Sequence, residues 1–573
     1  RQRQMCIRDR YWGTDAVSNS KYGYNGRPQA YLLRETTKNW RNANTLTYEN
    51  KKMFDGRDRL NVLVGHEVSS SMEESIENVS VNFPTTMGFE DMKANMGAGT
   101  ALPNQSTISA EENMLSFFGR VNYTMMDKYL LTVTVRADGS SKFAKNNRWG
   151  YFPSVSAGWV ITNEPFMESV KPWMDFFKIR ASWGQNGNCD ITNFQYLSTF
   201  TFGGNANYSF GNNKTGQNTG AYSDILANKD VTWETSEQLN IGFDARFFES
   251  RLGVNFDWYK KTTKDWLVQA PILASYGTNA PYINGGDVEN KGIELMLSWN
   301  DQVNDFKYGA RFNLAHNKNK VTRIANTEGI IHGPTNVLSN NTAEMFRAEV
   351  GYPIGYFYGY KTAGVFQNPE QVDNTKAKLE TAAPGDVIFV DVNGDGEITD
   401  DDKTMIGNPN PDVTMGFTLD FAYKGFDFSV TGMSALGHQI AKSYRQFSQN
   451  AFENYTTDIL GCWDGENTSN RLPRYSSGSN INWTNISDLY IEDADYFKLS
   501  NLTIGYDFKQ LWKNSPLSQI RLYFAAQNLF TITGYSGMDP EVGYGGGTTW
   551  GSGIDLGFYP SSRSYLVGVN LKF

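Results

Sequence analysis

The chain is 573 residues long, which exceeds one ordinary soluble domain, yet only 39% of its residues are hydrophobic. No stretch approaches the roughly 18 consecutive apolar residues that a membrane helix needs, so a helical membrane protein is excluded. The net charge of −9 excludes a general nucleic-acid binder, which would present a basic face. Aromatic residues make up 14% of the chain and glycine occurs 54 times, a composition typical of many strands joined by turns.

The first ten residues, RQRQMCIRDR, differ in character from everything that follows them. The string MCIRD resembles translated sequencing-adapter DNA, so we expect residues 1–10 to be an artefact rather than native protein. The alternative is a genuine but unusual stretch. The chain has neither an initiating Met nor a signal peptide, although the strands that follow demand export. We therefore expect a C-terminal fragment of a longer protein.

Alternation of apolar and polar residues with a period of two is the dominant pattern, and it predicts strands with one apolar face. In LNIGFDARF, Leu239–Phe247, the apolar positions alternate with Asn240 and Asp244. The pattern is weaker at Ala30–Thr36, Thr45–Glu49 and Leu60–Val68, and clear at Leu115–Tyr123, Tyr129–Val135, Phe177–Trp183, Leu252–Trp258, Ile293–Trp299, Tyr308–Leu314, Met415–Tyr423, Phe426–Val430 and Ile520–Ala526. We predict about 16 strands in all.

The connections between these strands alternate in length. The short ones lie near Met125–Lys128, Phe248–Arg251, Asn300–Asp305, Lys424–Gly425 and Lys509–Ser518. The long ones span 184–235, 263–288, 317–412, 436–494 and 530–562. Short turns at one end and long loops at the other are typical of outer-membrane barrels, whereas a soluble sandwich has no reason to sort its loops in this way. The sequence therefore predicts an all-β fold, a transmembrane antiparallel β-barrel.

Aromatic residues and the final strand agree with a barrel. Aromatic side chains recur at the predicted hairpin corners, where amphipathic rings settle at the level of the lipid headgroups. They include Phe247, Phe248, Trp258, Tyr259, Trp299, Tyr423, Tyr506, Phe508 and Phe530. The chain ends on YLVGVNLKF, an alternating strand with Phe573 at its end. Such a strand resembles the signal that barrel-assembly machinery recognises.

One motif predicts a metal site. The segment DVNGDGEITDDD, Asp391–Asp402, has the spacing of an EF-hand-like calcium loop, with a glycine at position 6 for the tight turn. The predicted oxygen ligands are Asp391, Asn393, Asp395, Glu397 and Asp402. Asp402 replaces the usual bidentate Glu, so we expect weak binding of a structural Ca²⁺. The alternative is an acidic, glycine-rich turn without a metal.

No catalytic constellation is apparent. The histidines, His66, His316, His332 and His438, and the cysteines, Cys6, Cys189 and Cys462, are scattered without metal-ligand or disulfide spacing. We therefore expect no enzyme activity and no cofactor other than calcium. Loop aromatics that could stack on sugars are Tyr455, Trp463, Trp483 and Trp550. Such rings more often fold a loop onto itself, so the substrate-binding residues stay unassigned.

Several segments resemble SusC/RagA-type TonB-dependent transporters, and they occur in the order of that family. They are KIRASWGQNGN (Lys178–Asn188), the segment Trp233–Leu267, NKGIELMLSW (Asn290–Trp299), PIGYFYGYKTAGVFQ (Pro353–Gln367), the segment Pro384–Phe417 and YPSSRSYLVGVNLKF (Tyr559–Phe573). The resemblance implies a barrel of about 22 strands in the outer membrane with a plug in its lumen, so that residues 11–573 form a partial barrel without the plug and first strands. Its long extracellular loops include 317–412 and 436–494.

The same resemblance implies a function and partners. Family members import oligosaccharides or peptides, with energy from the TonB complex and with a SusD-type surface lipoprotein as a lid. For this chain we expect oligosaccharides, with peptides as the alternative. We expect outer-membrane lipid around the wall and no nucleic-acid partner. Two other classes stay open: a secreted adhesin, and an enzyme built on an outer-membrane barrel, which would need a Ser/His or Asp/His set near one rim.

Overall fold

The computed structural model describes residues 2–11, 29–54, 56–84, 87–102, 105–202, 219–269, 272, 274–338, 342–443, 456–475 and 481–573. Strands dominate these residues, and the helices are short. None of the helices in the described ranges is both long enough and apolar enough to cross a membrane.

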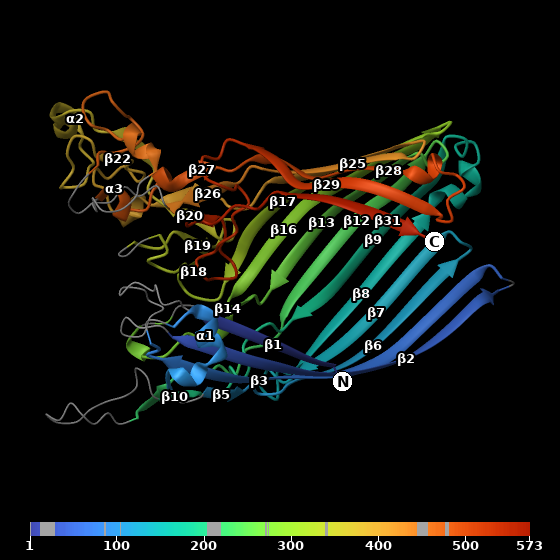
Figure 1. Ribbon diagram of the computed structural model, residues 1–573, viewed down its shortest axis with the longest axis horizontal. Coiled ribbons are helices and arrows are strands. Elements are labelled where there is room, and N and C mark those ends of the chain that lie inside the picture. Colours follow the sequence, from blue (N-terminus) through green and yellow to red (C-terminus); the bar gives the residue numbers. More distant parts are fainter. Residues whose placement is uncertain are drawn as a thin grey trace.

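One sheet dominates the described residues, and it contains 18 strands. Its ladder begins with β1 (Gln2–Tyr11), β2 (Ala30–Met53), β3 (Asp58–Val81), β6 (Glu112–Met125), β7 (Tyr129–Ser140), β8 (Trp149–Val160), β9 (Met174–Asn188) and β12 (Glu234–Phe247). It continues with β13 (Leu252–Lys264), β16 (Gly286–Val303), β17 (Phe306–Ile324), β24 (Val413–Tyr423), β25 (Phe426–Leu436), β28 (Tyr496–Asp507), β29 (Gln519–Thr533) and β31 (Ser564–Lys572). Each of these pairs with the next in antiparallel register, so they form one continuous up-and-down ladder (Figure 1).

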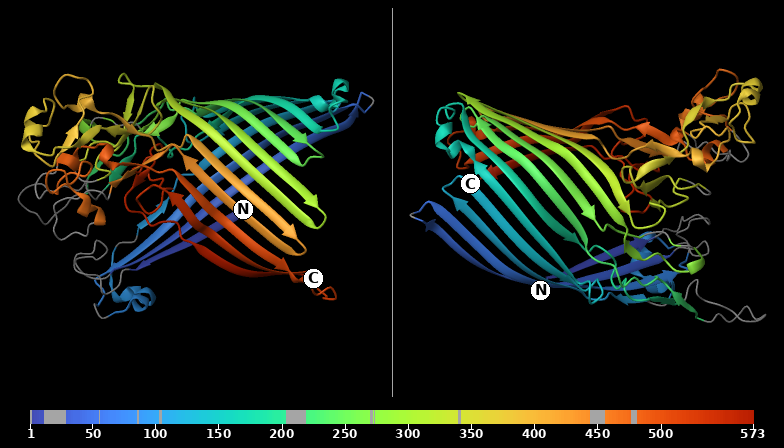
Figure 2. Two further views of the ribbon diagram at one scale, coloured as in Figure 1. Left: turned by 90° about the horizontal axis from the view of Figure 1, so that it is seen from above. Right: turned by 180° about the vertical axis from the view of Figure 1, so that it is seen from behind.

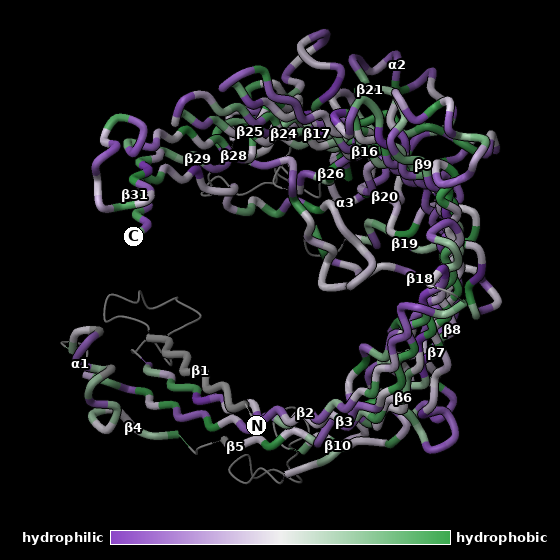
Figure 3. The backbone as a smooth tube through the Cα atoms, turned by 90° about the vertical axis from the view of Figure 1, so that its right-hand side faces the viewer, coloured by the Kyte–Doolittle hydropathy of each residue, from purple (hydrophilic) through white to green (hydrophobic). Residues whose placement is uncertain are grey.

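The ladder curves into an incomplete barrel. The short strands β4 (Thr100–Ala101) and β5 (Gln105–Ile108) extend β3 beside the ladder. Among the described residues, β1 pairs with β2 alone and β31 with β29 alone, so the two outer strands do not close on each other. Figure 3 shows the resulting open arc, with β31 and β1 on either side of the gap. The predicted antiparallel β-barrel wall of about 16 strands is therefore confirmed, and the ladder forms this wall.

The connections sort by length as predicted, with short turns at one end and long loops at the other (Figure 1). The tight turns require backbone that few side chains adopt: Asp127, Glu249 and Lys424 all have positive φ. At the opposite end, long connections follow β9, β13, β17, β25 and β29. Figure 2 shows this loop-rich end from two further directions.

The strands of the ladder differ from the predicted strands in two places. Ala30–Thr36 and Thr45–Glu49 belong to one long strand, β2, because the polar residues between them pair with β3 without interruption. Alternation fails there although the backbone ladder continues. The strand β8 was not predicted; it contains Pro153, which sits opposite Val135 inside the sheet. The prediction that residues 1–10 are foreign stays a prediction.

The two faces of the ladder differ in chemistry. On β12, Leu239 and Ile241 are exposed on the apolar face, whereas Asp244 on the other face bonds to Arg180. Exposed rings also lie at or near the short turns, including Phe248 and Tyr423. An apolar outer face and a polar inner face are what a barrel wall in lipid requires.

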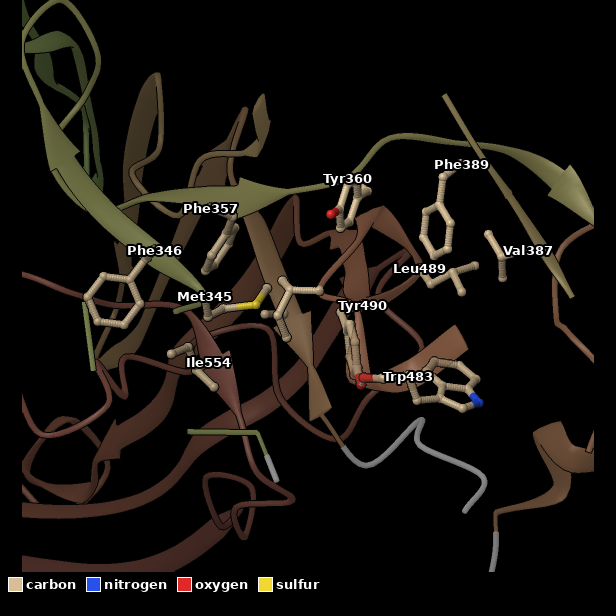
Figure 4. Close-up of a cluster of buried hydrophobic side chains, with 12 residues drawn as sticks. Met345, Phe346, Phe357, Tyr360, Val387, Phe389, Trp483, Leu489, Tyr490 and Ile554 are labelled. Atoms are coloured by element: carbon tan, nitrogen blue, oxygen red, sulfur yellow. Dashed lines mark hydrogen bonds between the residues drawn. The ribbon is translucent and has the colours of Figure 1, made fainter. Parts of the chain in front are cut away.

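The described residues of three long connections, 325–412, 437–495 and 534–563, fold together into one body, which we call the loop cap. Its strands are β18 (Ile330–His332), β19 (Phe346–Glu349), β20 (Tyr356–Gly359), β21 (Thr362–Val365), β22 (Val387–Phe389), β23 (Thr404–Gly407), β26 (Gln439–Lys442), β27 (Ile491–Asp493) and β30 (Ile554–Asp555). Its helices are α2 (Pro369–Asn374) and α3 (Ile481–Thr484). The cap has a buried core in which Phe357, Trp483 and Ile554 come from three different connections (Figure 4).

The remaining elements are small. Strand β10 (Phe200–Phe202) pairs with β11 (Ala221–Ser223), and β14 (Leu267–Gln269) pairs with β15 (Tyr282–Asn284). Helix α1 (Phe89–Ala94) follows β3. These elements extend the loop-rich end outside the cap.

Candidate functional site

A cleft of about 900 Å³ lies in the loop cap, where its three connections meet. Side chains and backbone from all three connections line it: Thr362, Gly364, Ile406, Gln439, Asp458, Gly461, Asn470, Arg471, Leu472, Asp488, Leu489, Ile491, Glu492, Asp493, Gly534 and Ser536. Its volume falls in the range of binding sites for small molecules. The lining combines acids, amides and hydroxyls with a few aliphatic side chains.

The carboxylates of the cleft are held by donors of the protein. Asp488 accepts hydrogen bonds from the backbone N–H of Thr362 at 3.1 Å and from its hydroxyl at 2.6 Å. Glu492 accepts from the N–H and the hydroxyl of Ser536, at 3.0 and 2.9 Å. The amide of Gln439 donates to Asp493 at 3.2 Å. These bonds fix the acids in place, and a carboxylate such as Asp488 or Asp493 has further lone pairs for a ligand.

One ammonium group lies under the cleft. Lys442 is only 3% exposed; its Nζ lies 3.3 Å from the carboxylate of Asp458 and donates to the Ser536 hydroxyl at 2.8 Å. The charge balance of the whole cap is nonetheless acidic: its three connections contain 25 Asp and Glu against 10 Lys and Arg. The rest of the chain has more basic than acidic residues.

The predicted calcium loop folds back on itself. Asp391 accepts from the backbone N–H groups of Gly394 at 2.6 Å and Gly396 at 2.8 Å. Asn393 accepts from the N–H of Asp395 at 2.9 Å, and Asp395 accepts from the N–H of Glu397 at 2.9 Å. The residues Asn393 and Asp395 are exposed. The positive φ of Gly394 and Gly396 permits these tight turns.

Asp402 closes this loop from inside. It is fully buried and accepts from the N–H groups of Val392 and Thr399, both at 2.8 Å. Burial alone would raise the pKa of Asp402, but the backbone N–H groups outweigh that effect and hold the pKa below its usual value. The all-oxygen donor set suits a hard cation such as calcium. Within the described ranges, however, no three acidic, His or Cys side chains converge on one metal position.

The loop aromatics mostly build the cap. Trp483 is buried in its core and Trp550 packs edge-on against Phe346. The indole N–H of Trp463 donates to Gln367 at 3.2 Å. Tyr455 lies outside the described residues. The interpretation that such rings fold the loops onto themselves is confirmed for Trp483 and Trp550.

The sequence did not indicate a charged cluster around His332. Glu344 lies 2.9 Å from one ring nitrogen of His332, and Glu328 lies 3.1 Å from the other. Glu344 also pairs with Arg347, whose guanidinium stacks on Tyr358 with 3.4 Å from its carbon to the ring centre. Burial alone would lower the pKa of His332, but the two glutamates raise it above its usual value. His66, His316 and His332 lie on β3, β17 and β18, and His438 lies between β25 and β26, so the four histidines form no common site.

On the inner face of the ladder, charges pair with each other. Arg180 contacts Asp244 and Asp257, and Arg521 contacts Asp427. These pairs neutralise part of the charge on the polar wall.

Comparisons with known proteins agree with this architecture. The sequence model of a family described as TonB dependent receptor-like, beta-barrel, matches residues 7–529. TonB-dependent receptor P3 of Formosa agariphila is 33% identical over 559 residues, 96% of this chain and 53% of that protein. TonB-dependent receptor SusC of Bacteroides thetaiotaomicron is 32% identical over 481 residues, 82% of this chain and 45% of that protein. The chain thus spans about half the length of these relatives. A structure of the RagAB peptide transporter aligns with a TM-score of 0.77 and 25% identity, over 100% of this chain and 58% of that one.

Proposed function

Because the chain belongs to the TonB-dependent receptor-like β-barrel family, we propose that it forms the wall and outer mouth of an importer of bulky nutrients. The barrel lies in the outer membrane, and the protein is a transport protein rather than an enzyme. Oligosaccharides are the proposed cargo. Energy would come from the TonB complex.

The observation that carries this proposal is the position of the cleft. Three connections from β17, β25 and β29 fold into a cap with its own core and cleft at one end of a wall whose inner face is polar. A binding site at the mouth of a polar lumen supports capture of cargo followed by passage. No covalent chemistry is needed for either step.

The lining of the cleft favours oligosaccharides. The carboxylate of Asp493 can accept hydrogen bonds from sugar hydroxyls, and the amide of Asn470 can both donate and accept them. Leu472 offers an apolar surface for the C–H face of a sugar. Peptides are the second candidate, because the chain resembles the RagAB peptide transporter over its whole length. A SusD-like lipoprotein that covers the cap is the proposed partner, supported by the likeness to SusC.

We also propose that the loop Asp391–Asp402 binds a structural calcium ion with modest affinity. The spacing of the oxygen-bearing side chains supports this proposal. The buried position of Asp402 supports it too, because it would place the ligand at loop position 12 on the inside of the loop. Binding would draw the exposed turn that contains Asn393 and Asp395 toward Asp402 and stiffen the cap.

Uptake by whole cells tests the main proposal. The full-length protein and a SusD-like lipoprotein from the same genome are expressed in a host that lacks its own importers, and labelled neutral oligosaccharides and peptides are supplied. We expect uptake of an oligosaccharide that stops when an uncoupler removes the proton gradient. Energised uptake of peptides alone would replace oligosaccharides by peptides as cargo. Failure to take up either class with both proteins in the membrane would contradict the importer proposal.

A further inference from the structure

The cleft of the loop cap is acidic, and so is its surrounding. Among the residues that the structure describes, four carboxylates line the cleft, Asp458, Asp488, Glu492 and Asp493, against one guanidinium, that of Arg471. Lys442 lies beneath and is engaged by Asp458 and Ser536. The cleft therefore has an excess of negative charge even when the buried lysine is included.

The wider cap reinforces this charge. With 25 acidic and 10 basic residues the three connections have a net charge of −15, whereas the whole chain has −9. The remainder of the chain is therefore net positive, and the acidic charge is concentrated where cargo first arrives. A cleft in which charges of one sign predominate focuses the electric field of its surroundings.

The acids of the cleft suit neutral hydroxyl-rich ligands. Asp488 receives two hydrogen bonds from Thr362 and Asp493 receives one from Gln439, which hold both carboxylates in fixed positions. An ionised carboxylate has about four acceptor sites, so these bonds leave acceptors for the hydroxyls of a sugar. Beside them lies apolar surface from aliphatic side chains, those of Leu472, Leu489 and Ile491. A sulfated or carboxylated sugar would instead place its anion against these acids.

We infer that the cleft formed by the three cap connections binds neutral oligosaccharides and excludes polyanionic ones, so that the charge of the cap selects the cargo. This inference rests on the proposed function and deepens it by naming the charge class of the substrate. Selection of this kind is electrostatic over distances near the Debye length, about 8 Å at physiological salt, and it weakens as salt rises.

The test uses matched ligand pairs and the full-length transporter with its lipoprotein. Neutral oligosaccharides prepared from starch, xylan and laminarin are each compared with their chemically sulfated form by titration calorimetry. At about 50 mM salt we expect a neutral oligosaccharide to bind at least about tenfold more tightly than its sulfated form. We call this ratio of affinities the gap, and we expect it to shrink severalfold at about 500 mM salt.

Two variants assign the selection to the cleft. Asp458→Asn combined with Asp493→Asn should narrow the gap at low salt, because it removes two cleft charges and keeps side-chain size. Glu370→Gln is the matched control: Glu370 lies exposed on α2 of the same cap, outside the cleft lining, and the gap should persist.

The possible results distinguish failure of the charge selection from failure of the proposed function. A sulfated form that binds as tightly as its neutral partner at low salt would overturn the charge selection and leave the importer of oligosaccharides in place. A gap that narrows equally in Glu370→Gln would overturn the role of the cleft. If no oligosaccharide of either charge binds and peptides do, both the inference and the proposed cargo are wrong.

Discussion

Arg180 on β9 and Asp257 on β13 form an ion pair that crosses the strand between them. The two residues sit in register on either side of Gly242 on β12, and Nη2 of Arg180 donates to Oδ2 of Asp257 at 2.6 Å. A Cβ at Gly242 would lie 2.6 Å from Oδ1 of Asp257 and would also collide with the carbonyl of Phe256. The missing side chain at Gly242 therefore leaves room for this ion pair.

The substitution Gly242→Ala should therefore destabilise the barrel wall by about 1–3 kcal/mol, because the new methyl must displace either the ion pair or the backbone. The measurement is the urea midpoint of the full-length barrel in detergent or lipid. Gly119→Ala on β6 is the control, since a Cβ there would meet its nearest neighbour at 3.8 Å. Equal midpoints for the two variants would contradict the role assigned to Gly242.

The cap should also depend on Asp402. Replacing it by Ala removes the carboxylate that accepts from the N–H groups of Val392 and Thr399, and hydrogen bonds to a charged group of this kind contribute about 1.5–3 kcal/mol each. We expect faster amide hydrogen exchange over 391–403 without calcium present. Asp401→Ala, at the exposed neighbour, should leave exchange unchanged. Unchanged exchange in Asp402→Ala would show that the loop does not depend on this carboxylate.

Calcium should stabilise the same loop. In the full-length protein stripped with a chelator, millimolar calcium should slow hydrogen exchange over 391–403, and magnesium should do so less, because the loop supplies flexible oxygen ligands. Asp395→Ala removes a predicted ligand that is exposed, so it should abolish the calcium response without unfolding the cap. Identical exchange with calcium and with chelator would leave an acidic turn without a metal.

The hairpin of β18 and β19 should respond to pH through His332. Burial alone would lower the pKa of His332, but Glu344 and Glu328 raise it above the unfolded value of about 6.5. The imidazolium therefore stabilises the hairpin fully below about pH 6.5, and this contribution is lost as the pH rises through the raised value.

Limited proteolysis of the hairpin between about pH 5.5 and about pH 8.5 measures this response. We expect protection to fall with rising pH in the native protein. His332→Gln should lose the pH dependence, whereas His316→Gln, on β17 and outside the cluster, should keep it. A native hairpin that is cleaved equally at both ends of the pH range would contradict the stabilising role of the His332 imidazolium.

Much of the wall could be predicted from local sequence. The alternation in Leu239–Phe247 and the tight turn around Glu249 depend on neighbours in the chain, because strand faces repeat every two residues and turn length sets hairpin pairing. The alternation of short and long connections could also be predicted, because it follows from the spacing of the predicted strands along the chain. The same reasoning failed between Thr36 and Thr45, where the partner strand rather than the residue pattern maintains β2.

The sequence by itself determined an antiparallel wall with one apolar and one polar face, its loop-rich end and the spacing of the acidic loop at Asp391–Asp402. Only the tertiary structure decided that Thr362, Glu492 and Ser536 line one cleft, that Glu344 meets His332, and that Gly242 lies beneath an ion pair. Thr362 and Ser536 are far apart in the chain, and their meeting depends on how three separate connections pack. Periodicity reports which face a residue occupies, but it does not report which distant residue shares that face.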